Sequence, residues 1–379
     1  MFCVIPAVAG AQTQDLPLPP AVTTILEAFQ KPFHPLLGGV APGGGLGVGI
    51  GYTTPRSEDW FRDGSAMITV NRFWYLRGET GRQTNRSQIG VFGQMRNMGR
   101  LDFFGIGPDS SREARTDFRL RETTGGVRGY VRPIPAIRLG GYAAIYSPQL
   151  GSGGSPALSS IEEIFLPVEV PALNDDPTFT RYRGFVEFYY PQAADSADEG
   201  YRATYQIAGE AFRDRDLNRY NFHRFETETK QRFRGFRPGQ RLTVHGLMAL
   251  TNSDGLVPYY LQYTLGGGGG LSAFRPDMLG TDGSMATVRS YQNYRFRDRD
   301  IVLMQAEYRI PLGRSIDATV FYDAGQVAGR AADLFDGFKQ GTGFSLSYMH
   351  KGATLGRVDV GYGAGEGLHF FWGFGGFNF

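Results

Sequence analysis

The sequence predicts an all-β protein, an antiparallel transmembrane β-barrel of about sixteen strands. Three observations lead to this fold class. Apolar and polar residues alternate along most of the chain after Gly44, charges of both signs crowd the polar face of the alternation, and aromatic residues gather near the ends of the expected strands. A soluble β-sandwich would share the alternation, but the charged rows and the aromatic ends favour a barrel in lipid.

Composition agrees with strands and turns. The chain has 379 residues, 54 of them glycine, and aromatic residues make up 14%. Its mean hydropathy is −0.28, and no window holds the roughly 18 apolar residues that a spanning helix needs. Lysine and arginine total 39 and aspartate and glutamate 37. A nucleic-acid partner is therefore not expected, because such proteins carry a strong positive excess.

The chain begins with an apolar stretch, residues 1–11, that ends in small residues and resembles the second half of a secretory signal peptide. A disordered apolar tail is the alternative. Cys3 lies in this stretch and is the single cysteine, so an internal disulfide is excluded. Residues 12–43 are interpreted as an N-terminal leader with one short helix between Pro20 and Lys31, and a flexible leader is the alternative.

The barrel is expected to occupy residues 44–379. Between Ile316 and Gly325, apolar side chains at the even positions alternate with Asp317, Thr319 and Asp323. Successive side chains of a strand point to opposite faces, so one face contacts lipid and the other lines a water-filled lumen. The expected strands are 44–53, 61–70, 72–82, 87–97, 115–132, 135–147, 178–190, 200–213, 219–233, 239–250, 257–264, 300–311, 314–325, 341–350, 354–363 and 367–379.

The terminal strand and two long connections complete the expected architecture. Phe371, Phe377 and Phe379 share one parity in the last strand, which is expected to close the barrel against the first, because a free edge invites pairing. An aromatic edge strand of a soluble protein is the alternative. The connections 148–177 and 265–299 are long enough to suggest a function.

The sequence holds no recognisable catalytic or cofactor site. Its five histidines do not fall at metal-ligand spacing, and the glycine run 266–270 lacks the Gly-Lys-Ser/Thr of a phosphate loop. The Gly-x-Ser-x-Gly pattern of a serine nucleophile does not occur either. We therefore predict no catalytic residues, no metal and no cofactor, and an enzyme is the least favoured functional class.

Several stretches resemble one family of proteins. They match, in order and spacing, the barrel domain of the BamA/TamA superfamily, the bacterial surface antigen family of outer-membrane assembly and secretion proteins. The resemblance covers about Pro35 to Phe379. It is carried by Phe103–Ser110 (FFGIGPDS), Val257–Gly267 (VPYYLQYTLGG), Val288–Arg309 (VRSYQNYRFRDRDIVLMQAEYR), Val320–Gly325 (VFYDAG) and the final Phe379.

This resemblance implies a lock inside the lumen. In the family a long loop folds back into the barrel, and its arginine meets the aspartate of a Phe-x-Asp-x-Gly motif. That motif matches Phe321, Asp323 and Gly325, and the local alternation also turns these three to one face. Two unrelated charges, each solvated in a wet lumen, are the alternative.

The loop arginine has two candidates. Arg289 follows Val288 and lies at the expected distance before the RFRD stretch, Arg295 to Asp298. Ser290 replaces the usual glycine of the motif. Arg275 is the reserve, since an insertion has separated the two halves of the family signature. A bidentate contact from either arginine to Asp323 would offset part of the entropy lost when so long a loop is ordered.

The resemblance implies insertion or translocation of polypeptides at the outer membrane, by an integral and monomeric protein. Its expected partners are the lipid bilayer and either client polypeptides or a separate periplasmic partner, because residues 12–43 leave no room for the periplasmic repeat domains of typical members. A barrel-only member is therefore expected. The seam between 44–53 and 367–379 is predicted to be weakly paired. A passive channel or structural scaffold is the alternative.

Overall fold

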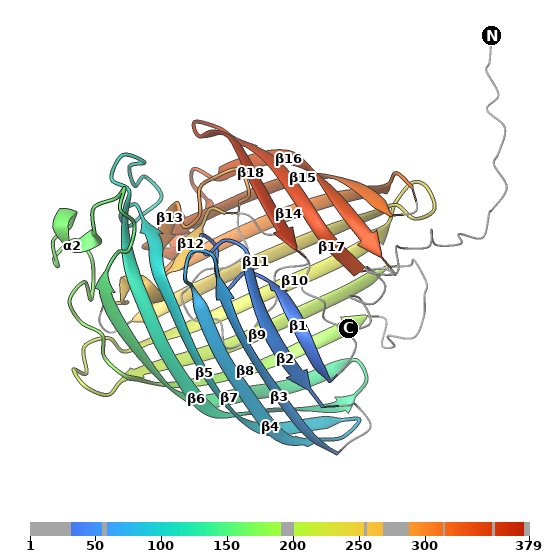
Figure 1. The fold of residues 1–379 in the computed structure, drawn as a ribbon, viewed down its shortest axis with the longest axis horizontal. Helices are drawn as coiled ribbons and strands as arrows, with labels where there is room; N and C mark the ends of the chain where they lie inside the picture. The colour runs from blue at the N-terminus through green and yellow to red at the C-terminus, as the bar shows by residue number, and fades with distance from the viewer. Residues whose placement is uncertain are drawn as a thin grey trace, which may run out of the picture.

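The computed structural model describes residues 32–54, 59–190, 201–253, 256–267, 288–313, 315–350 and 353–374. Within these residues sixteen antiparallel strands form one sheet that curves into a barrel (Figure 1). The expected fold class is thus confirmed. The wall consists of β1 (Phe33–Gly38), β2 (Gly47–Thr53), β3 (Trp60–Thr69), β4 (Trp74–Gln83), β5 (Ser87–Phe103), β6 (Thr116–Ile134), β7 (Ile137–Ser152), β8 (Phe179–Tyr190), β9 (Arg202–Asp214), β10 (Phe222–Arg234), β11 (Arg241–Ser253), β14 (Asp300–Pro311), β15 (Ile316–Ala328), β16 (Lys339–His350), β17 (Ala353–Gly363) and β18 (Gly367–Phe374).

A few short elements lie outside the wall. β12 (Tyr263–Leu265) and β13 (Phe296–Asp298) pair with each other in a separate two-stranded sheet. The helical turns are α2 (Ile161–Ile164), η1 (Tyr259–Leu261) and η2 (Ala331–Phe335). None of the helices in the described ranges has the length and apolar character needed to cross a membrane.

The two faces of the wall follow the alternation of the sequence. On β15, Val320 and Tyr322 are 54% and 47% exposed, whereas Asp317 and Asp323 on the opposite face are 4% and 0% exposed. The same apolar exterior continues around the barrel. It includes Val48 on β2, Leu76 on β4, Ile89 on β5, Val127 on β6, Leu139 on β7, Phe188 on β8, Ile207 on β9, Phe225 on β10, Met304 on β14, Phe344 on β16, Val358 on β17 and Phe370 on β18. So large an apolar exterior requires lipid around it.

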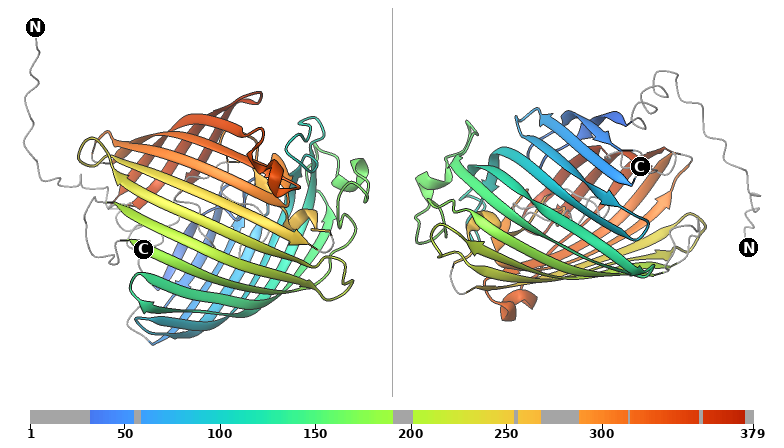
Figure 2. Two further views of the ribbon diagram at one scale, coloured as in Figure 1. Left: turned by 180° about the vertical axis from the view of Figure 1, so that it is seen from behind. Right: turned by 90° about the horizontal axis from the view of Figure 1, so that it is seen from below.

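The two ends of the barrel differ in their connections. One end, called the loop end, carries the long connections 104–115, 153–178 and 254–299, and α2 marks it in Figure 1. The other, called the turn end, has short connections such as 84–86 and 135–136. Barrels of this class place long loops outside the cell and short turns in the periplasm, which orients the strands. Figure 2 shows the curved wall from two further sides.

Two strand predictions were wrong, in opposite directions. The first strand, β1, lies within the expected leader and pairs with β2 from Phe33 opposite Tyr52. The expected strand 257–264 leaves the wall and forms η1 and the start of β12. Its Tyr259, Tyr260 and Leu261 are all buried, so it has no lipid face. The two errors cancel, and the count of sixteen holds. The expected signal remnant and leader helix lie outside the described residues.

The sheet ends at β1 on one side and β18 on the other. Within the described residues no ladder pairs these two strands, so the seam lies between β1 and β18, not at 44–53. On β18, Phe371 is opposite Asp359 and therefore turns to the lumen, where its ring stacks on His369 at 6.2 Å between centroids. The expected closing residues Phe377 and Phe379 lie outside the described residues.

Candidate functional site: a loop anchored in the lumen

The inner wall near the C-terminus gathers three carboxylates. Glu307 on β14, Asp323 on β15 and Asp359 on β17 all lie on the lumenal face of their strands. The register brings them close: Glu307 is opposite Phe321, and Gln305 is opposite Asp323. Carboxylates this near one another in a partly dehydrated space need cations.

Arg289 supplies the central positive charge. It is carried by the long connection between β11 and β14, and its side chain is 0% exposed. Its Nη2 donates to Asp323 Oδ1 at 2.6 Å and its Nε to Asp323 Oδ2 at 2.7 Å. Its backbone N–H also donates to Asp323 Oδ2, at 3.1 Å. Such a two-pronged contact fixes both the position and the direction of the guanidinium.

Further groups complete the surroundings of this guanidinium. Nη1 of Arg289 donates to Glu307, and the guanidinium carbon lies 3.7 Å from the centre of the Phe321 ring. Arg357 on β17 bridges the remaining charges, since its Nη2 donates to Glu307 at 2.9 Å and its Nε to Asp359 at 2.8 Å. Two arginines thus interlock with three carboxylates. Removing one partner from such a buried set leaves an uncompensated charge.

Glycines on the wall make room for the loop backbone. A Cβ at Gly363 would lie 2.4 Å from the carbonyl oxygen of Ser290, and one at Gly361 would lie 2.9 Å from that of Arg289. Gly325 has a related role, since a Cβ there would come within 3.1 Å of Leu265 on β12. At Gly361 and Gly363, glycine is therefore required because the loop backbone approaches the strand closely.

Arg295 and Tyr294 tie the same loop to neighbouring connections of the loop end, and Arg297 joins the two stretches of the loop to each other. Nε of Arg295 donates to Glu366 in the β17–β18 turn at 2.6 Å. Arg297 donates from Nη1 to the carbonyl oxygen of Tyr259 at 2.7 Å. The hydroxyl of Tyr294 donates to the carbonyl oxygen of Pro42, in the β1–β2 connection, at 3.2 Å. The loop therefore contacts connections on both sides of the seam.

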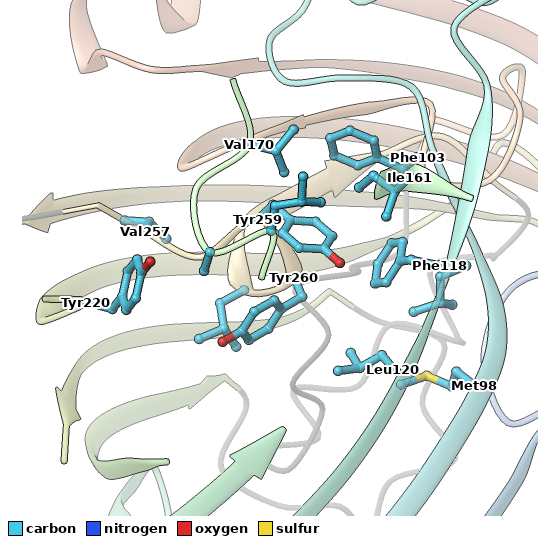
Figure 3. Packing of buried hydrophobic residues seen from close by; sticks show 14 of the residues in the cluster. Met98, Phe103, Phe118, Leu120, Ile161, Val170, Tyr220, Val257, Tyr259 and Tyr260 are labelled. Atoms are coloured by element: carbon cyan, nitrogen blue, oxygen red, sulfur yellow. The ribbon is translucent and has the colours of Figure 1, made fainter. Parts of the chain in front are cut away.

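An apolar cluster packs against the other half of the loop. The Tyr259 ring lies 5.5 Å from that of Phe103 and 4.9 Å from that of Phe118, both in edge-to-face geometry. Figure 3 shows these rings with Ile161 and Val170, which come from the long β7–β8 connection. Strand ends and several connections of the loop end thus share one core.

The structure brings four of the predicted site residues together. Arg289, Asp323 and Phe321 are in direct contact, and Gly325 lies on the same lumenal face of β15. The two charges are buried and paired, unlike the solvated alternative. The reserve candidate Arg275 lies outside the described residues.

Sequence reasoning missed the rest of the network. Three further charged residues also face the lumen: Glu307, Arg357 and Asp359. Their positions in the alternation of β14 and β17 indicated this lumenal direction. The glycines Gly361 and Gly363 carried a similar signal, because they repeat on the lumenal positions of one strand. No group of histidine, cysteine, aspartate and glutamate in the described part of the chain is arranged to hold a metal ion.

Comparison with known proteins identifies the fold through structure alone. No protein-family model matches the sequence, and no curated protein matches it. Among solved structures, the barrel is similar to BamA from Haemophilus ducreyi lacking POTRA domains 1–3, with a TM-score of 0.59 and 12% identity over 91% of this chain and 69% of that one.

Two CdiB structures are similar as well. CdiB from Escherichia coli has a TM-score of 0.58 at 10% identity, covering 91% of this chain and 63% of that one. CdiB from Acinetobacter baumannii has a TM-score of 0.54 at 10% identity, covering 91% and 58%. This chain therefore spans less than two thirds of either CdiB chain. The fold is that of a BamA-type barrel, as the sequence resemblance predicted, and with its apolar exterior the protein is an integral barrel of the outer-membrane type.

Proposed function

We propose that this barrel handles polypeptides at the outer membrane, assisting their insertion or translocation, and that it is not an enzyme. The observation that carries the proposal is the seam between β1 and β18, across which no ladder forms within the described residues. An edge strand presents free N–H and C=O groups on which another strand can pair. The similarity of the fold to BamA and CdiB supports this function.

The seam matters because it lies in a wall that faces lipid. Unpaired backbone groups in hydrocarbon cost several kcal/mol each, so an open edge must find a partner. Either the other edge or a strand of a client can satisfy it. β1 is six residues long, so even a closed seam would hold only a few hydrogen bonds.

The strand beside the edge is also weak. A Cβ at Gly49 on β2 would lie 2.2 Å from the carbonyl oxygen of Ala66 on β3, so no larger residue fits there without a shift of the backbone. Glycine within a strand lowers its stability and lets it bend. The first strands are therefore suited to move away from β18.

We assign the contact of Arg289 with Asp323 the role of a lock that holds the loop inside the lumen. Because the same loop contacts Pro42 and Glu366 beside the seam, an ordered loop stabilises the barrel where the described strands leave the sheet open. The partners under this proposal are the lipid bilayer and either client polypeptides or a separate periplasmic protein. The barrel acts as a monomer and needs no cofactor.

A disulfide across the seam tests the function. Leu37→Cys combined with either Leu368→Cys or Phe370→Cys joins the outward faces of β1 and β18, in a chain that also carries Cys3→Ser. Activity is measured as the insertion of a denatured eight-stranded barrel into liposomes, scored by protection from protease. We expect the oxidised protein to lose this activity and to recover it on reduction.

The matched control is a disulfide between neighbours that never separate. Val48→Cys with Ile68→Cys joins directly opposed residues of β2 and β3, both on the lipid face, and it should leave insertion unchanged. If the seam-locked protein inserts clients at the full rate, the seam is not a gate. A steady ion conductance that persists in the locked barrel would instead favour the passive channel.

A further inference from the structure

The lumen near the turn end carries a group of positive side chains. They lie within a few residues of the strand ends at the turn end, on the lumenal parity of four neighbouring strands, which are the yellow-green to orange strands of Figure 2. The group, called the basic mouth, consists of Arg202 on β9, Lys230, Arg232 and Arg234 on β10, Arg241 on β11 and Arg309 on β14.

The register sets like charges against one another in this group. Arg232 is directly opposite Arg202. Arg234 is opposite Arg241, and Arg241 is in turn opposite Arg309. Like charges directly across a ladder destabilise a sheet. These arginine pairs lower the stability of the sheet and recur across four strands. We therefore look for a binding function that explains why they are present.

Elsewhere in the lumen the pairing is the reverse. Arg96 faces Glu122 with an ion pair of 2.5 Å, and Arg181 faces Glu210, also at 2.5 Å. Those arginines are neutralised by the wall itself. In the basic mouth, Asp317 contacts Arg309, but the register sets arginine opposite arginine at three places.

The shape of the basic mouth indicates the class of anion. Neighbouring strands are about 4.8 Å apart, so the row Arg234–Arg241–Arg309 spans about 10 Å. The row Arg202–Arg232 lies about 7 Å further along the strands. A single phosphate is too small to cover this area. A lipid headgroup reaches the outer face, whereas these side chains point inward. An extended peptide, which advances about 3.3 Å per residue, can place several carboxylates along the rows.

We propose that the basic mouth binds carboxylate-rich segments of polypeptides as they enter the barrel from the periplasmic side. This inference rests on the proposed function and names a substrate feature that it recruits. Exposed ion pairs form quickly and dissociate easily, so they suit a step that captures a chain and then releases it.

Binding of a model peptide tests the inference. The probe is a fluorescein-labelled deca-glutamate peptide added to the purified full chain in detergent micelles, and its dissociation constant is measured by fluorescence anisotropy at several salt concentrations. The double variant Arg232→Gln with Arg241→Gln should bind about tenfold more weakly and should show a shallower dependence on salt. The control is Arg112→Gln with Arg219→Gln, which removes the same charge from exposed positions at the loop end and should bind as the unmodified protein does.

Three outcomes overturn the inference. Equal weakening in both double variants means that net charge alone attracts the peptide. Unchanged binding in the basic-mouth variant means that the peptide binds elsewhere. The third outcome is displacement of the peptide by tripolyphosphate at a far lower concentration than free deca-glutamate needs. That result would indicate a phosphate site. The peptide-binding assay needs neither client insertion nor seam opening. Its result can therefore be interpreted even if the seam experiment fails, and the seam experiment can be interpreted even if peptide binding fails.

Discussion

Two stretches of the same inward loop are held by different forces. Residues 257–267 are buried through apolar packing, with the ring of Tyr259 set against those of Phe103 on β5 and Phe118 on β6. Residues 288–298 are held by arginines, of which Arg289 alone makes two side-chain hydrogen bonds to Asp323. The first stretch depends on many small contacts, and the second depends on a few strong ones.

The difference teaches how sensitive each stretch is to a single change. Dispersion and burial are shared among many atoms, so a conservative change in the apolar stretch leaves most of them in place. A buried ion network concentrates its contribution in a few atoms, and removing one partner exposes the full desolvation cost of the others. Four changes, taken from the largest expected effect to the smallest, test this contrast.

Asp323→Asn should have the largest effect, because it leaves the buried guanidinium of Arg289 without its closest anion. We expect the free energy of unfolding to fall by about 3–5 kcal/mol, measured by urea titration in detergent micelles, and residues 288–298 to become open to protease. Asp333→Asn, which removes the exposed partner of Arg330, serves as control and should change neither readout. Equal stability of both variants would contradict a buried lock.

Arg289→Lys should have the next largest effect. The ammonium keeps the charge but cannot make the two-pronged contact with Asp323 or stack on Phe321. We expect a loss of about 1.5–3 kcal/mol in the same titration. A lysine variant as stable as the unmodified protein would mean that charge alone, without geometry, holds the loop.

Gly363→Ala tests the close approach of the charged stretch to the wall. The added methyl would meet the carbonyl oxygen of Ser290, and we expect a destabilisation of about 1–3 kcal/mol. Gly78→Ala is the matched control, since nothing lies within 4 Å of a Cβ there, and it should be neutral or slightly stabilising. If the two glycines behave alike, the loop does not pack against β17 as described.

Tyr259→Phe should have the smallest effect, because it keeps the ring that packs on Phe103 and Phe118 and removes only a hydroxyl. We expect a change below about 0.5 kcal/mol and no new protease site in residues 257–267. A large loss of stability would show that the apolar stretch also depends on one polar contact, and the contrast between the two stretches would then fail.

Much of the wall was predictable. The alternation within 316–325 places Asp323 in the lumen and Val320 on the lipid face, as observed. The family resemblance singled out Arg289, which indeed lies against Asp323. The anchoring carboxylates Glu307 and Asp359 escaped notice, because an acidic residue at a lumenal position has no local sign that distinguishes a loop contact from a solvated charge.

The strand at the start of the wall was missed for a similar reason. β1 is short and contains Pro35, so its local pattern is weak. It is a strand because β2 offers it a hydrogen-bonding edge. The segment around Tyr259 was wrongly predicted as a wall strand, because its β-favouring residues pack into a core built from distant strands and connections.

The sequence by itself determined which side of the wall each side chain faces, since that direction alternates with every residue and needs no partner. The tertiary structure alone decided where the sheet ends, which loop enters the lumen and which charges meet there. Those outcomes depend on curvature and register accumulated over sixteen strands, and no short stretch of residues encodes them.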